Sequence, residues 1–144
     1  LMRLAQLPNI IGVKEASGNI SQIMEILRIR PQGFMLFSGD DAITLPVLSV
    51  GGDGVISVVA NETPALLHEM VWSAFNGDWQ RSQELHHFLM PLMELNFIES
   101  NPIPVKTAMA MMGLLEENFR LPLVGMSAEN REKLRRCLVD LKLI

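Results

Sequence analysis

The sequence contains no tyrosine, a single cysteine at Cys137 and no long uninterrupted hydrophobic run. A lone cysteine excludes an internal disulfide, so a reducing compartment is the expected environment. No apolar run approaches the ~20 residues that a membrane-spanning helix needs, and residues 1–4 lead into a polar break rather than a signal peptide. These absences predict a cytoplasmic protein that does not enter a membrane.

Charge is also sparse. Only 19% of the 144 residues are charged, the formal net charge is −4, and 49% of the residues are hydrophobic. This balance argues against a partner such as nucleic acid or an anionic membrane, and it predicts a chain that buries a sizeable core. The three histidines lack the spacing of a zinc-binding helix, so no metal site is expected. Because the first residues resemble the end of a helix, we expect a fragment of a longer polypeptide.

Residues 1–62 alternate short apolar runs with helical patterns. Strands are expected at residues 10–14, 34–37 and 55–59, and a short helix at 42–50, bent near Pro46. The first helix, capped by Asn19 or Ser21, should bury the apolar face formed by Ile20, Ile23, Met24 and Leu27. Uninterrupted apolar strands with short links indicate parallel βα units, in a barrel or in a doubly wound sheet.

Residues 63–144 are predicted to be helical throughout. Thr63 should cap a helix with Pro64 at its first position, Asp78 should begin the next helix, and Ser127 should cap the last one. Another helix should begin at residues 101–104. The side chains expected in the core are Leu85, Phe88, Leu89, Leu92, Met93, Leu134, Leu138 and Leu141. Three parallel strands cannot close a barrel, so we expect further protein to cover the sheet edges.

Lys14 is the strongest candidate for a catalytic residue, because an apolar run ends in it and small residues follow. Burial would disfavour the ammonium form and lower the lysine pKa, which would free the amine to attack a carbonyl carbon. The alternative is a lysine that leaves the core and reaches water at the end of a strand.

Other candidate residues follow the expected strands, where the sites of βα enzymes lie. Gly39 would let the backbone approach a small ligand, or is an ordinary turn glycine. Ile56 would form an apolar wall, or is simply part of the core, and Asn61 lies beyond it. Asp40 and Asp41 are adjacent, so their side chains should diverge, and at least one should cap the following helix.

Four segments give the chain a wider resemblance. They are residues 12–18, 38–41, 51–61 and 101–106. Together they closely resemble the C-terminal half of the dihydrodipicolinate synthase family, and the resemblance covers essentially the whole chain. It implies the C-terminal part of a (β/α)8 TIM barrel. Residues 1–62 would supply strands six to eight, and residues 63–144 the closing barrel helix and a C-terminal helical region.

The same resemblance implies a role for each candidate residue. Lys14 would form a Schiff base with pyruvate, Gly39 and Ile56 would line the pyruvate site, and Asp40 and Asn61 would lie at its rim. The family condenses pyruvate with L-aspartate 4-semialdehyde in lysine and diaminopimelate biosynthesis, needs no metal or organic cofactor, and usually forms a dimer of dimers. Its proton-relay tyrosine, paired threonines and substrate-binding arginine lie in the N-terminal half, so we expect this chain to be catalytically incomplete.

Two alternatives remain open at this point. The chain could belong to another pyruvate-dependent class I aldolase or lyase, similar to the sialic acid lyases, with a different aldehyde. It could also be a non-catalytic half-barrel that serves as an assembly module.

Overall fold

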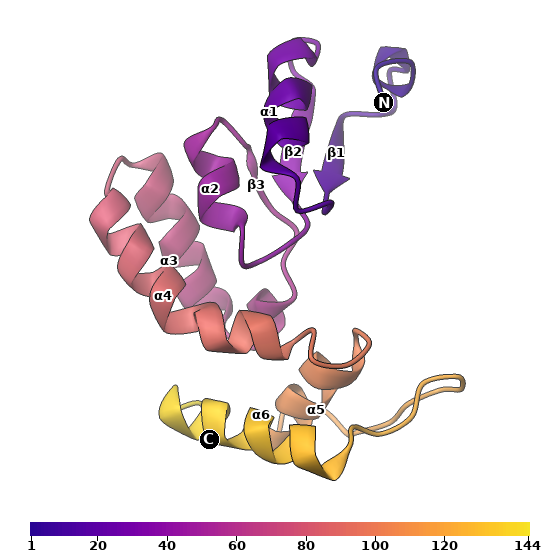
Figure 1. Ribbon diagram of the computed structural model, residues 1–144, viewed down its shortest axis with the longest axis vertical. Coiled ribbons are helices and arrows are strands. Elements are labelled where there is room, and N and C mark those ends of the chain that lie inside the picture. Colours follow the sequence, from indigo (N-terminus) through magenta and orange to yellow (C-terminus); the bar gives the residue numbers. More distant parts are fainter.

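A three-stranded parallel sheet occupies the N-terminal part of the computed structural model, which describes residues 1–144 (Figure 1). Its strands are β1 (Gly12–Glu15), β2 (Met35–Ser38) and β3 (Gly54–Val55), in the order β1-β2-β3. In the parallel register Lys14 lies opposite Phe37, and Ser38 lies opposite Val55. The predicted parallel sheet is confirmed, and its carboxyl ends meet at one edge.

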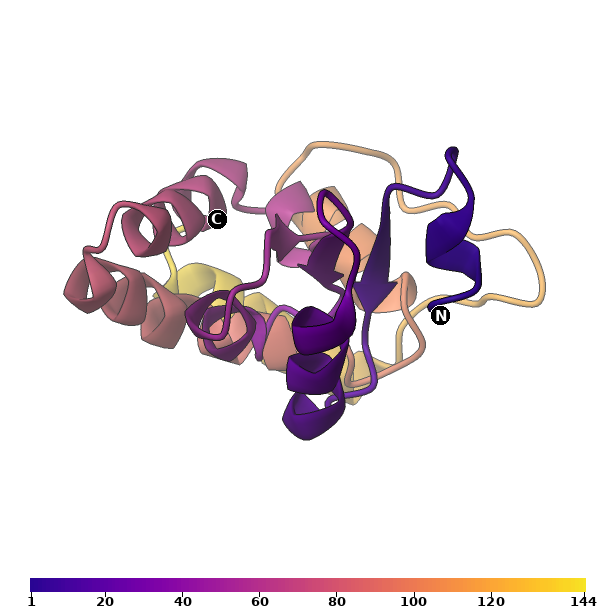
Figure 2. The same ribbon diagram turned by 90° about the horizontal axis from the view of Figure 1, so that it is seen from above.

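Six α-helices and two short 3₁₀ turns complete the chain. They are η1 (Leu4–Gln6), α1 (Ile20–Ile29), α2 (Thr44–Ser49), η2 (Val59–Asn61), α3 (Pro64–Phe75), α4 (Trp79–Leu95), α5 (Ile103–Met111) and α6 (Ala128–Asp140). In both ribbon views the α5–α6 connection extends away from the helices as a long loop (Figure 1, Figure 2). None of the helices combines the length and the apolar character that crossing a bilayer requires.

The largest hydrophobic core lies among the helices rather than beneath the sheet. Fourteen buried residues, drawn mainly from α3, α4, α5 and α6, pack together, and Leu89, Leu92, Leu134 and Leu138 are completely buried. A second cluster of three buried residues connects α1, β2 and α2. The helical part of the chain therefore has a core of its own.

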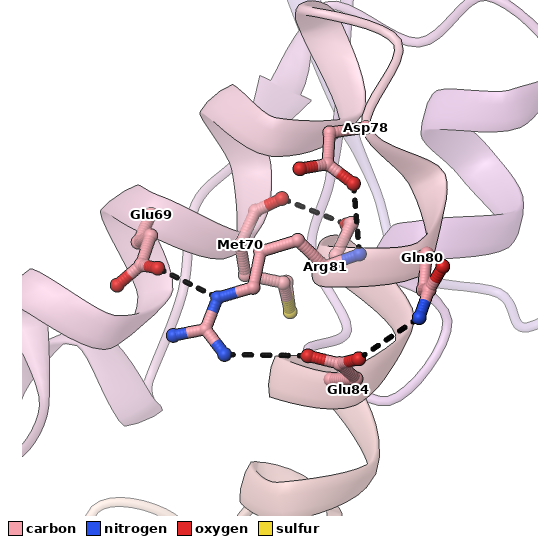
Figure 3. A network of polar contacts seen from close by, with 7 residues as sticks. Glu69, Met70, Asp78, Gln80, Arg81 and Glu84 are labelled. Carbon is pink, nitrogen blue, oxygen red and sulfur yellow. Dashed lines mark hydrogen bonds and ion pairs between the residues drawn. The ribbon is translucent and has the colours of Figure 1, made fainter.

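The pairing of α3 with α4 rests on polar contacts as well as on this core (Figure 3). Asp78 accepts a hydrogen bond from the Arg81 amide at 3.0 Å, so the predicted cap is confirmed. The Ser82 hydroxyl donates to the Met70 carbonyl at 2.8 Å, and the Arg81 side chain donates to Glu69 at 2.8 Å. The buried Ser82 bond contributes most, since exposed ion pairs add little.

The predicted helix caps are confirmed in two further cases and wrong in two. Neither Asp40 nor Asp41 caps α2, whose N-cap residue is Ile43 and which has no side-chain cap. Asn19 accepts from the Gln22 amide at 3.1 Å, and Ser127 accepts from the Asn130 amide at 3.4 Å. Thr63 makes no side-chain cap, although Pro64 begins α3 as predicted. The Thr63 hydroxyl instead donates to a carbonyl of the preceding η2 turn at 3.2 Å, because the backbone is already coiled there.

The third strand is shorter than predicted. A strand was expected over residues 55–59, but pairing stops at Val55. The amides of Val58 and Val59 each donate to the Asp41 carboxylate at 2.9 Å, and the chain turns into η2. A buried carboxylate thus takes donors that a continuing strand would have used, and the prediction of a long third strand is wrong.

Some apolar side chains expected in the core lie at the surface. Ile20 and Met24 of α1 are 37% and 50% exposed, whereas Ile23 is completely buried. Phe88 of α4 is 44% exposed. The predictions for these exposed side chains are wrong, in α1 because the helix packs on the sheet through Ile23, Ile26 and Leu27 instead.

The chain exposes more surface than its size requires. Its accessible surface is 8354 Å², whereas the scaling for folded monomers gives about 7,400 Å² for a mass of 16.1 kDa. Both outer strands, β1 and β3, pair with β2 alone. Exposed apolar area and unpaired strand edges are the features of a surface that other protein covers.

Candidate functional site

The end of β1 and the end of β2 bring Lys14 against Gly39. The Gly39 amide donates to the Glu15 carbonyl at 2.7 Å, which fixes the two strand ends together. A Cβ atom placed on Gly39 would lie 2.8 Å from Lys14 Cε and 2.9 Å from both Lys14 Cγ and Ala16 Cβ. Gly39 does not have a positive φ angle. The glycine is therefore required by space, since the lysine stem crosses its backbone.

Lys14 itself is exposed, so the predicted buried amine is wrong for this chain. The reason is that β1 is an outer strand, and nothing packs over its free side. The next residue, Glu15, is 8% exposed. Its carboxylate accepts from the Ser17 amide at 3.2 Å and from the Gln22 side chain at 3.1 Å. Glu15 therefore shapes the turn that follows the lysine, a role that the sequence did not reveal.

Ile56 lies beside the same strand ends, and Asn61 lies farther along the chain. The Ile56 amide donates to the Ser38 carbonyl at 2.8 Å, and its side chain is 48% exposed. The Asn61 side chain is exposed and donates to the Val58 carbonyl at 2.9 Å. Lys14, Gly39 and Ile56 thus lie at the carboxyl ends of three adjacent strands, whereas the Asn61 side-chain amide is directed to its own turn.

Asp40 and Asp41 point in different directions, as predicted. Asp40 accepts from the Ala42 amide at 3.0 Å and so supports the turn into α2. Asp41 is 1% exposed, and its Oδ2 atom accepts hydrogen bonds from the Val58 and Val59 amides. Asp41 therefore joins the loop after β2 to the loop after β3, a contact between residues 17 and 18 positions apart.

A cavity of about 380 Å³ opens beside these strand ends. It lies between the turn after β2 and the end of α4, and it is lined by Ala16, Gly39, Asp40, Ala42, Met93, Glu94 and Phe97. His86 of α4 is hydrogen-bonded to the Ala42 carbonyl at 2.8 Å, which fixes the helix to the turn. The contribution of α4 to this cavity was not predicted, because its lining residues lie more than fifty positions from the turn.

Metal-binding side chains do not gather here. The structure has no group of three or more His, Cys, Asp or Glu side chains placed to hold a metal ion. A different buried cluster lies behind the strand ends, where Glu62 accepts from the Asn96 side chain at 2.7 Å. No local sequence pattern predicts this pair, because its two members lie 34 positions apart.

Parallel βα units with a lysine, a glycine turn and an apolar side chain at the strand ends define an α/β protein of the βα-enzyme class. The model of the dihydrodipicolinate synthetase family matches residues 1–141. The chain belongs to this family.

Individual relatives agree with that assignment. The chain is 54% identical over 140 residues to the 4-hydroxy-tetrahydrodipicolinate synthase of Koribacter versatilis, covering 97% of this chain and 47% of the relative. The crystal structure of dihydrodipicolinate synthase from Aquifex aeolicus is 44% identical, with a TM-score of 0.96, over 99% of this chain and 49% of that one. The chain thus spans about half the length of the curated relatives it matches.

One solved relative carries information about a ligand. The chloride-inhibited dihydrodipicolinate synthase from Acinetobacter baumannii was crystallised in complex with pyruvate. It is 37% identical to this chain, with a TM-score of 0.94, over 99% of this chain and 49% of that one. These solved relatives are TIM barrels, and this chain has the fold of one part of such a barrel.

Proposed function

We propose that this chain is the lysine-bearing half of a Schiff-base lyase that condenses pyruvate with L-aspartate 4-semialdehyde in lysine and diaminopimelate biosynthesis. The observation that carries the proposal is the packing of the Lys14 stem across Gly39 at the ends of β1 and β2, where a Cβ would lie 2.8 Å from Lys14 Cε. Family membership and the pyruvate complex of a relative support the same ligand.

The proposed chemistry assigns one role to each residue. The unprotonated Lys14 amine attacks the ketone carbon of pyruvate, and loss of water gives an imine. The protonated imine withdraws electrons, so a methyl proton can leave and an enamine forms. The enamine carbon then attacks the aldehyde, and the amine of the second substrate displaces Lys14 during ring closure. Gly39 and Ile56 line the pyruvate, and Asp40 and Asn61 lie at the rim.

The proposal includes the place of this chain in a larger barrel. Residues 1–62 would form the last three βα units, strands six to eight, and residues 63–144 the closing helix and the C-terminal helical region. The free edges of β1 and β3 would then pair with strands of an N-terminal half. That half would also supply the proton-relay residues and the arginine that binds the second substrate. The complete enzyme would be a cytoplasmic dimer of dimers.

Burial of Lys14 should depend on that other half. In this chain the amine is exposed to solvent, whereas attack on a ketone is favoured by a desolvated amine. We therefore expect the chain alone to form little pyruvate adduct, and the completed barrel to form it readily. The N-terminal half of the Koribacter versatilis relative, co-expressed or fused, is a suitable complement.

The test is borohydride trapping with pyruvate, read by intact mass and peptide mapping. The proposal expects one reduced adduct on Lys14 in the completed barrel, its loss in Lys14→Arg, and its retention in the exposed control Lys133→Arg. An adduct on other lysines, or none in a complex shown to be folded by circular dichroism, refutes the proposal. The second outcome would favour a non-catalytic module, and product analysis with different aldehydes separates the enzyme from a sialic acid lyase-like aldolase.

A further inference from the structure

Behind the strand ends lies a buried cluster of three polar side chains from three separate segments. Asp41 precedes α2 and is 1% exposed, Glu62 follows η2 and is 4% exposed, and Asn96 follows α4 and is completely buried. The Asn96 amide nitrogen donates to Glu62 Oε2 at 2.7 Å. Asp41 Oδ2 accepts the Val58 and Val59 amides. The cluster therefore joins the C-terminal helices to both loops that flank the proposed pyruvate site.

Each of the three side chains also keeps one buried oxygen without a hydrogen-bond partner. These atoms are Asp41 Oδ1, Glu62 Oε1 and Asn96 Oδ1. An unpaired buried acceptor is costly, and two ionised carboxylates buried close together are more so. All three free atoms are acceptors, so the cluster lacks a donor.

The surroundings supply no positive charge to compensate. The charged group that acts on Glu62 is Asp41, which is not a cation, and the neighbouring Cys137 of α6 carries no positive charge either. Burial raises the pKa of Glu62, nearby Asp41 adds to the rise and the Asn96 hydrogen bond opposes it, so that the pKa reaches about 8. Burial and the charges of Asp140 and Glu62 also raise the pKa of Cys137, to about 11, so this thiol stays neutral.

We propose that Glu62 is a positioning residue. Its carboxyl group stays protonated on Oε1 and donates a hydrogen bond to the free oxygen of Asp41, Oδ1. The inference rests on the proposed function, because its consequence is the placement of the site wall. A proton on Glu62 supplies the donor that the cluster lacks and leaves one negative charge on Asp41. That carboxylate can then keep the Val58 and Val59 amides, and so hold the loop after β3, which carries Ile56, beside the strand ends.

Removal of the proton reverses this arrangement. Two adjacent buried carboxylates repel each other, and the Asp41 side chain is the one whose displacement releases the Val58 and Val59 amides. Since Asn96 lies between Glu94 and Phe97 of the cavity wall, the same repulsion also acts on the end of α4. Asp41, Glu62 and Asn96 thus connect the protonation of one carboxyl group to the shape of both walls of the site.

The first test needs no substrate and uses the chain itself. Glu62→Gln keeps the shape and a donor but cannot ionise, and the exposed Glu84→Gln is the matched control. We expect an infrared carbonyl band of a protonated carboxylic acid at pH 7 in the wild type and in Glu84→Gln, and its absence in Glu62→Gln. A missing band in the folded wild type overturns the proposal. A second result also overturns it. If the stability of the wild type rises with sodium, potassium or magnesium concentration and that of Glu62→Gln does not, a bound cation rather than a proton neutralises Asp41 and Glu62.

The second test measures the positioning role in the completed barrel. The rate of pyruvate trapping is followed from pH 7 to pH 9 and expressed as the ratio of wild type to Glu62→Gln, so that pH effects common to both proteins cancel. One pH unit above the pKa about nine-tenths of the carboxyl groups are ionised, so this ratio should fall about tenfold. A constant ratio overturns the positioning role. If the infrared band is present but no variant forms an adduct, the proposed function fails, and the positioning role fails with it.

Discussion

The substitution Gly39→Ala tests the contact on which the proposed site depends. The new Cβ would lie 2.9 Å from Lys14 Cγ and from Ala16 Cβ, and carbon atoms in contact need about 3.5 Å. The mismatch of about 0.6 Å cannot be relieved at the flexible Lys14 Cε atom alone, because the other two atoms lie close to the backbone of β1. The strand end must therefore move away from the turn.

The size of the effect follows from that displacement. Overpacking of this kind costs about 1–3 kcal/mol of unfolding free energy. A misplacement of 1 Å in a reacting group lowers rates about 10²-fold, so a shift of about 0.6 Å should slow pyruvate trapping on the order of tenfold. Urea unfolding of the chain measures the first effect, and borohydride trapping in the completed barrel measures the second.

Gly125→Ala is the matched control, since no atom lies within 4 Å of its added Cβ and its φ angle is not positive. We expect it to leave both measurements unchanged. If Gly39→Ala traps pyruvate at the wild-type rate, the glycine does not position the lysine and the reasoning is wrong. If both glycine variants lose stability equally, the cause is not the close contact at Lys14.

Further predictions follow from the buried residues and from the exposed surface. Because the pKa of Glu62 is raised from 4.5 to about 8, the folded state binds more protons in that interval, so unfolding free energy should fall as pH rises through it. At 1.36 kcal/mol per unit the fall is at most about 5 kcal/mol, and a flat curve in urea titrations would contradict it. Asp41→Ala removes the acceptor of two amides and should cost about 3 kcal/mol in the same assay, with a loss under about 1 kcal/mol as the opposing result. Leu89→Ala should cost about 2–5 kcal/mol, whereas Leu121→Ala, at an 87% exposed position, should stay within about 0.5 kcal/mol, and equal losses would refute the assigned core. Trp72 is 51% exposed and should shift its fluorescence to the blue when the N-terminal half binds, tested with the other tryptophan replaced by Phe; an unchanged spectrum would place this face outside the interface.

The sequence predicted those parts of the fold that depend on local signals. The strand ending at Lys14, the strand before Gly39 and the caps at Asp78 and Ser127 all follow from periodicity and from capping preferences within a few residues. The meeting of the strand ends followed from parallel pairing, which needs no knowledge of distant contacts.

Long-range contacts explain what the sequence did not predict. The third strand ends early because Asp41 binds the Val58 and Val59 amides from 17 and 18 positions away. Asn96 lies in an apolar run at the end of α4, where only its partner Glu62 explains a buried amide. The exposure of Lys14 depends on the free edge of β1, which no other strand of this chain pairs with.

The location of the main core has a consequence for how two halves of such a barrel would join. The fourteen-residue core lies entirely within this chain, whereas the free surfaces are the edges of β1 and β3. Helix packing can therefore be completed before the halves meet, and the seam would combine backbone hydrogen bonds between strands with contacts of exposed apolar side chains such as Ile11 and Ile56. We expect such a chain to fold separately and then to associate through its unpaired strand edges. It would suit complementation assays in which recovery of Lys14 reactivity reports the association of two folded fragments.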